Sequence, residues 1–273
     1  MSADRSDKFC RTTYSRYSDF AVEGPCMAKR VGFIQTGGIG DLIMILPIAD
    51  HYEEQGWEIV WPVDERFVTM FRRIKPSINF LPVAGWPVND RAYYLDRPLE
   101  HISGFDCERT IIFYMPILGL NISDPRLAAS LKIDEYKYAI SGVPFARKWQ
   151  LEYERDMERE QSLYDSLQIT GPYVCVHEEG ANLRLPVPVS KEIQERYRII
   201  RVEALTDSVF DWLLTFERAD KLMFIDGCFA NLVEQMQLRV EKQLFFRSHA
   251  IYTPVFRTGW KFRHFEPGNL VAA

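Results

Sequence analysis

The chain has 273 residues, of which 47% are hydrophobic and 26% are charged, and its formal net charge is −5. This apolar content is enough for a core without disulfide or metal support, and the five scattered cysteines lack the spacing of a zinc site. An acidic balance argues against a protein that coats nucleic acid through a surplus of lysine and arginine.

Residues 1–29 form a polar leader of mixed charge, which we expect to be a loose extension. The first 20 residues lack the apolar centre of a secretion signal. No apolar run approaches the roughly 18 residues that would suggest a membrane span. The sequence therefore predicts a cytoplasmic protein with no membrane span.

From residue 30 onward, short β-rich runs alternate with helical patterns. Strands are predicted at 30–36, 57–63, 78–83 and 108–116, and helices at 41–55 and 65–74. A charged helical stretch at 145–168 leads to a second alternation, with strands at 171–180, 197–202, 221–226 and 242–248 and helices at 208–219 and 228–238. Such alternation predicts parallel sheets with crossover helices.

The fold class predicted from this order is α/β, with two Rossmann-like domains that face each other across a cleft. We place the first domain at 30–150 and the second, with a C-terminal tail, at 151–273. Each domain directs a helix N-terminus at the carboxyl edge of its sheet, where ligands bind in open α/β folds.

The stretch "TGGIGDLIMILP" (36–47) turns the first strand into its helix. Gly37, Gly38 and Gly40 would let a phosphate or sugar approach the backbone closely. The dinucleotide fingerprint would need a third glycine where Ile43 stands, so a Rossmann oxidoreductase is a less favoured alternative. The simplest alternative for Asp41 is a helix-capping aspartate.

Two segments resemble the heptosyltransferase-type glycosyltransferases, which have the two-domain GT-B fold. "GDLIMILP" (40–47) has the spacing of that family's Gly-Asp-x-x-x-x-Leu-Pro signature. "FIDGCFANLVEQM" (224–236) is similar to its second signature, strand-Asp-Thr-Gly-Leu-x-His-Leu. Here Gly227 replaces the threonine, Cys228 the glycine and Asn231 the histidine. The resemblance covers most of residues 30–248.

The resemblance implies inverting transfer of a sugar from a nucleoside diphosphate, with neither a metal ion nor a cofactor. Asp41 would be the general base, because a carboxylate within reach of a hydroxyl can remove its proton, and a helix N-terminus favours the ionised form. The amides at the start of the second-domain helix would stabilise the departing diphosphate. The candidate donor-binding residues implied for the second domain are Arg184, Lys191, Asp226, Gly227, Cys228, Phe229 and Asn231.

Other polar residues follow strand ends. His177 and Glu179 could contact the donor, or they could simply end a strand. Asp64 and Glu65 could touch acceptor hydroxyls, although an exposed acidic turn is favoured. The stretch 245–267 mixes aromatic residues with cations and histidines, and we expect it to pack on the first domain rather than to bind nucleic acid. Its charged and imidazole side chains are Arg247, His249, Arg257, Lys261, Arg263 and His264.

The sequence thus predicts a glycosyltransferase whose partners are a nucleotide sugar and a hydroxyl-bearing acceptor. The acceptor stays open between lipopolysaccharide, another glycan, a protein and a modified nucleic-acid base. A non-catalytic nucleotide-sugar-binding protein is the main alternative, because the second signature is substituted at three positions.

Overall fold

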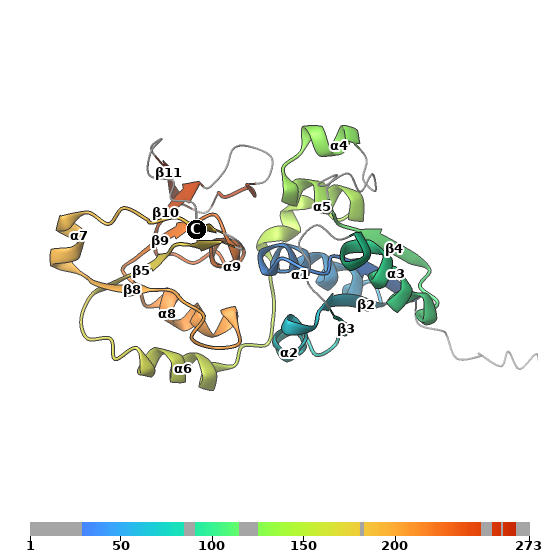
Figure 1. Cartoon of the computed structure of the whole chain (residues 1–273), viewed down its shortest axis with the longest axis horizontal. Helices are drawn as coiled ribbons and strands as arrows, with labels where there is room; N and C mark the ends of the chain where they lie inside the picture. The colour runs from blue at the N-terminus through green and yellow to red at the C-terminus, as the bar shows by residue number, and fades with distance from the viewer. Residues whose placement is uncertain are drawn as a thin grey trace, which may run out of the picture.

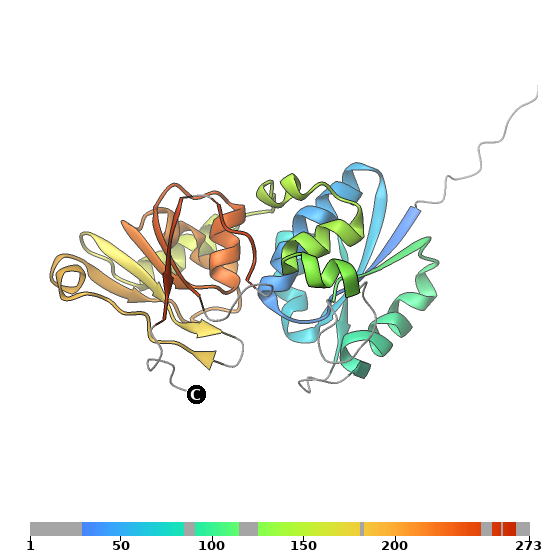
Figure 2. The same cartoon turned by 90° about the horizontal axis from the view of Figure 1, so that it is seen from above.

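A computed structural model describes residues 29–84, 91–114, 125–180, 183–246, 253–257 and 259–265. The predicted extension therefore lies outside the described residues, except for Lys29. The described chain forms two α/β halves that lie side by side, each built around its own sheet (Figures 1 and 2). None of the described helices is both long enough and apolar enough to cross a membrane.

The first half contains a four-stranded parallel sheet with the strand order β3-β2-β1-β4. Its strands are β1 (Lys29–Ile34), β2 (Trp57–Asp64), β3 (Asn79–Val83) and β4 (Arg109–Ile112). Its helices are α1 (Ile39–Glu54), α2 (Glu65–Ile74), the π-helix η1 (Ala92–Asp96), α3 (Arg97–Ile102), the 3₁₀-helix η2 (Ser103–Phe105), α4 (Pro125–Ser130), α5 (Ile133–Ser141) and the 3₁₀-helix η3 (Phe145–Trp149). Strand β1 is buried from Val31 onward, as its nearly continuous apolar sequence predicts for a central parallel strand.

The second half contains a five-stranded parallel sheet with the order β11-β10-β9-β5-β8. Its strands are β5 (Tyr173–His177), β8 (Arg198–Arg201), β9 (Lys221–Ile225), β10 (Glu241–Phe246) and β11 (Trp260–His264). A short antiparallel pair is formed by β6 (Glu179–Gly180) and β7 (Leu183–Arg184). The helices are α6 (Met157–Ser166), α7 (Lys191–Arg196), the 3₁₀-helix η4 (Val209–Trp212), α8 (Leu213–Glu217) and α9 (Cys228–Gln235).

The α/β class and the parallel sheets are confirmed, but the continuous helix expected at 145–168 is wrong. The chain forms η3, then runs without helix through 150–156, and resumes as α6. Leu151 is buried, and the amide of Glu154 donates to the carbonyl of Ile74, so this segment packs against the first half. Asp156 begins α6 by accepting a hydrogen bond from the amide of Arg159.

The proline in α1 explains one contact between the halves. Pro47 lies inside the helix and has no N–H, so it cannot donate to the carbonyl four residues earlier. That carbonyl, of Ile43, instead accepts a hydrogen bond of 3.1 Å from Nε2 of Gln235 in α9. The Leu-Pro part of the motif therefore makes a backbone carbonyl of α1 available as a hydrogen-bond acceptor for a side chain of the second half.

A buried ion pair of the first half holds a backbone segment of the second half on one side. The Lys148 ammonium and the Asp134 carboxylate are 2.5 Å apart, and both side chains have 0% exposure. The ammonium also donates to the carbonyl of Val255, whose amide donates to the Asp134 carboxylate. On the solvent side, exposed Asp207 of the second half meets Arg73 of α2 at 3.4 Å.

Candidate functional site

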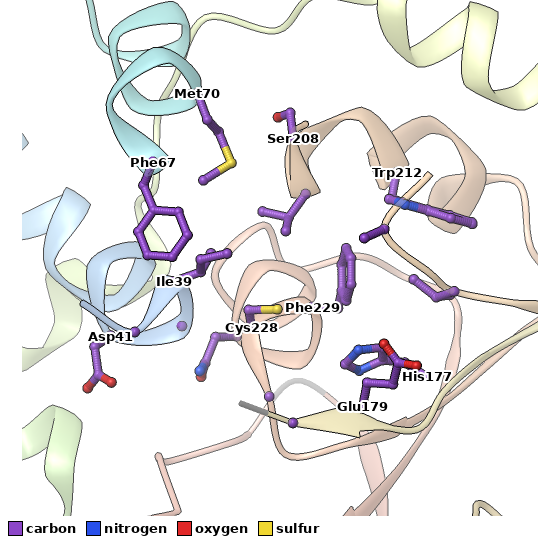
Figure 3. A pocket seen from close by; sticks show the side chains of 18 of the residues that line it. Ile39, Asp41, Phe67, Met70, His177, Glu179, Ser208, Trp212, Cys228 and Phe229 are labelled. Carbon is purple, nitrogen blue, oxygen red and sulfur yellow. The ribbon is translucent and has the colours of Figure 1, made fainter. Parts of the chain in front are cut away.

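A pocket of about 680 Å³ is lined by residues from both halves (Figure 3). Helices α1 and α2 contribute Ile39, Phe67 and Met70, and the second half contributes Trp212 and Ser208, among others. The predicted site residues that line this pocket are Gly38, Gly40, Asp41, His177, Glu179, Asp226, Gly227, Cys228, Phe229 and Asn231. Gly37, Arg184 and Lys191 are not among its lining residues.

The glycine turn at the start of α1 already has a protein partner. The hydroxyl of Tyr114 accepts hydrogen bonds from the amides of Thr36, at 2.6 Å, and Gly37, at 3.3 Å. Burial raises the pKa of Tyr114 above its usual value, so the hydroxyl stays neutral. These two amides are therefore not available to a phosphate, which disfavours the dinucleotide-binding alternative for this turn.

Asp41 lies in the first turn of α1, at the first-half end of the pocket. Its side chain is 31% exposed, and Oδ1 is 3.1 Å from the ammonium of Lys137. In Figure 3 the carboxylate points away from Cys228 and Phe229. Asp41 thus lines the pocket, but its carboxylate does not face the start of α9.

Lys137 of α5 is a site residue that the sequence did not reveal. Its side chain is 1% exposed, and its ammonium donates to Oε1 of Gln35, at 2.7 Å, and to the carbonyl of Phe113, at 3.2 Å. Burial lowers the pKa of Lys137, an effect that the Asp41 and Asp134 carboxylates oppose. No local pattern marks this lysine, because its contacts come from distant parts of the chain.

Gly38 sets the position of the Asp41 carboxylate. Its φ is +83°, a conformation that side chains disfavour, and an added Cβ would lie 2.6 Å from Oδ2 of Asp41. We expect Gly38→Ala to lower the free energy of unfolding by about 1–3 kcal/mol, because the new methyl group meets both backbone strain and the carboxylate. Urea unfolding measures this loss. Gly104→Ala is the control, since a Cβ there has no neighbour within 4 Å, and equal losses in the two variants would contradict the prediction.

The start of α9 lies inside the pocket, directly after β9. Gly227 precedes the helix, and a Cβ on it would be 3.5 Å from the His177 ring. His177 is buried at the end of β5, with its ring centroid 4.8 Å from that of Phe229. Asp226 is also buried and accepts a hydrogen bond of 3.3 Å from the hydroxyl of Thr253. The second signature thus forms one wall of the pocket.

The first turns of α1 and α9 touch each other. A Cβ on Gly40 would lie 3.3 Å from Nδ2 of Asn231 and 3.4 Å from the Cα of Cys228. Asn231 is buried, and its Oδ1 has no hydrogen-bond partner among the described residues. Gly40 therefore permits a close approach of the two helix starts, which a larger residue would obstruct.

Two predicted donor-binding cations lie away from the pocket lining. The Arg184 guanidinium is 3.5 Å from the buried Glu178 carboxylate, which also pairs with Arg201. Lys191 is the exposed first residue of α7, which lies at the far edge of the second half in Figure 1. The Glu178 carboxylate therefore holds Arg184 outside the pocket lining, and Lys191 lies outside it in α7.

Arg66 is the cation that lines the pocket in the part of the chain that the structure describes. Its guanidinium contacts both carboxylate oxygens of Asp64, each at 2.8 Å. The expected exposed acidic turn is therefore wrong for Asp64, which is buried and also accepts from the Tyr93 hydroxyl. Burial acts to raise the pKa of Asp64, but its hydrogen bonds to Arg66 and Tyr93 outweigh that effect and lower it. Asp64 caps α2 and holds Arg66, while Glu65 is exposed.

Part of the C-terminal stretch packs on the first half, as expected. Arg257 stacks on the ring of Trp149, and buried Trp260 donates to the Glu234 carboxylate, which also accepts from Trp149. Lys261, Arg263 and His264 lie on the exposed part of β11. Arg247 and His249 lie outside the described residues.

Neither protein-family models nor curated proteins match this sequence, whereas solved structures do match the fold. A glycosyl transferase family 9 protein from Veillonella parvula is similar at 13% identity, with a TM-score of 0.58, over 86% of this chain and 87% of its own. ADP-heptose lps heptosyltransferase II from E. coli is similar at 10% identity, with a TM-score of 0.56, over 88% of this chain and 92% of its own.

The fold therefore belongs to the class seen in family 9 glycosyltransferases. More narrowly, it is the fold of a heptosyltransferase over most of the chain, which confirms the resemblance at the level of the fold.

Proposed function

We propose that this chain is a metal-independent glycosyltransferase that transfers a sugar from a nucleoside diphosphate to an acceptor hydroxyl with inversion. The two halves are proposed to act as the two domains of a GT-B enzyme, with the described pocket as the site between them. The observation that carries the proposal is that one pocket contains both Asp41, at the start of α1, and the start of α9. The heptosyltransferase fold supports the choice of reaction.

In the proposed reaction, Asp41 accepts the proton of the acceptor hydroxyl while that oxygen bonds to the anomeric carbon. The bond between this carbon and the diphosphate breaks on the opposite face, and the diphosphate leaves with the electron pair. The amides of Gly227, Cys228 and Phe229 would stabilise its charge, because a helix N-terminus favours anions. Arg66, the pocket's cation among the described residues, could add to this effect.

The orientation of Asp41 restricts where the acceptor can bind. Its carboxylate points away from Cys228 and Phe229, so the acceptor hydroxyl is proposed to reach it from a side other than that of α9. The donor would occupy the part of the pocket beside His177 and Trp212.

Ligand-dependent thermal unfolding tests the donor site. A nucleoside diphosphate or its sugar at 100 times its dissociation constant should raise Tm by about 5–10 °C. Gly227→Leu should remove this increase, because its side chain enters the space beside the His177 ring while the extended backbone at Gly227 accepts any residue. Gly104→Leu, in open surroundings, should keep it. An unchanged increase in the Gly227 variant would contradict donor binding at this position.

Turnover distinguishes the enzyme from a non-catalytic nucleotide-sugar-binding protein. Asn231, which stands where the family signature has histidine, is buried with an unpartnered Oδ1 among the described residues, and this keeps the binding-protein alternative relevant. Release of nucleoside diphosphate with a matching mass gain on an acceptor would establish transfer. Donor affinity without release, including slow hydrolysis, would favour the binding protein.

A further inference from the structure

We propose that Lys137 is a positioning residue for Asp41, in that its ammonium holds Oδ1 and leaves Oδ2 for the acceptor hydroxyl. This inference rests on the proposed function, in which Asp41 is the base. It assigns a task to a residue of α5 that lies outside both sequence signatures.

The contacts of Lys137 are all internal to the protein. Its ammonium has three N–H donors, and it is surrounded by the Gln35 side chain, the Phe113 carbonyl and Oδ1 of Asp41. With 1% exposure, this side chain has no surface on which to receive a substrate anion. A role in substrate binding is therefore excluded, and a role through Asp41 remains.

The two carboxylate oxygens of Asp41 have different surroundings. Oδ1 faces Lys137, whereas Oδ2 lies beside Gly38, where the missing Cβ leaves room. The side chain as a whole is 31% exposed, and Asp41 lines the pocket. One oxygen is thus held by a cation, and we assign the other to the acceptor hydroxyl.

The charge of Lys137 has a second consequence. A buried ammonium is costly without a partner of opposite charge, and Oδ1 of Asp41 supplies one at 3.1 Å. This pairing holds the carboxylate against α5 in the resting protein. After Asp41 has accepted the acceptor's proton, it passes that proton to solvent and the ion pair forms again. The other ionisable groups near this pair are Tyr94 and Tyr114, near Asp41, and Asp134, near Lys137.

The division of the effect between kcat and KM tests this role. Lys137→Met should lower kcat at neutral pH by about 10–100-fold through misplacement of the base, with the donor KM unchanged. Lys75→Met is the matched control. It breaks the Lys75–Asp50 ion pair, whose side chains are each 11% exposed and which does not line the pocket, so it should lower stability without lowering kcat.

Carbon-13 NMR of labelled aspartate carboxyl groups separates this inference from the proposed function. The Asp41 signal, assigned by its loss in Asp41→Asn, should change its chemical shift at neutral pH in Lys137→Met, which removes the contact at Oδ1, and should keep it in Lys75→Met. This measurement needs no turnover, so it remains decisive if the chain transfers no sugar. Lys137→Gln replaces the Met variant if that protein does not fold. An unchanged chemical shift of Asp41 together with an unchanged kcat in Lys137→Met would overturn the role of Lys137.

Discussion

Asp41→Asn is expected to lower kcat for sugar transfer by about 10²–10⁴-fold, which is the usual contribution of a general base. Asparagine has nearly the same shape as aspartate but cannot take up the acceptor's proton. Affinity for the nucleoside diphosphate should be unchanged, because the carboxylate points away from the start of α9. Steady-state kinetics and calorimetry measure the two effects separately.

Glu65→Gln is the control for this loss. Glu65 is also a carboxylate in the first turn of a helix that follows a strand of the same sheet, but it is exposed and does not line the pocket. Its replacement should leave kcat unchanged. Retained transfer in Asp41→Asn would remove Asp41 from its proposed role while leaving the fold and the donor site unaffected.

Lys148→Met is expected to lower the free energy of unfolding by about 3–5 kcal/mol, since it leaves a charged partner buried without compensation. That partner, Asp134, has 0% exposure and would keep only its hydrogen bond from the amide of Val255 as a direct link across the halves. Urea unfolding followed by circular dichroism measures the loss.

Lys261→Met provides the surface comparison. Lys261 pairs with Glu241 at 2.8 Å, but the two side chains are 59% and 40% exposed, so this change should alter stability by less than about 1 kcal/mol. Adding Asp134→Leu to Lys148→Met should restore part of the loss, because no buried charge is then left alone. Equal stabilities of the two lysine variants would refute the importance of the buried pair.

The sequence predicted the site best where a strand turns directly into a helix. Such corners carry local signals, namely the glycines before Asp41 and the Asp226-Gly227 step before α9. Because the carboxyl ends of parallel strands lie along one edge of a sheet, these corners also identified residues that line one pocket. His177 and Glu179 were found by the same reasoning.

The residues that the sequence did not identify depend on contacts between distant segments. Lys137 is 102 positions from Gln35, and α5 had not been predicted as a helix. Arg66 had a local signal, because Asp64 is a helix cap two positions earlier, but only the structure shows that its guanidinium lines the pocket. The charged sequence at 145–168 is compatible with a continuous helix. In the structure the chain is not helical at 150–156, where Leu151 is buried against the first half.

Two of the contacts between the halves differ in burial, and this difference selects a direction of movement. The exposed Arg73–Asp207 contact is worth less than about 1 kcal/mol. At Val255, by contrast, the backbone of the second half makes hydrogen bonds to the buried Lys148 and Asp134, and a hydrogen bond to a charged group is worth about 1.5–3 kcal/mol. We therefore expect the halves to separate first between α2 and Asp207, with Val255 as the point about which they rotate.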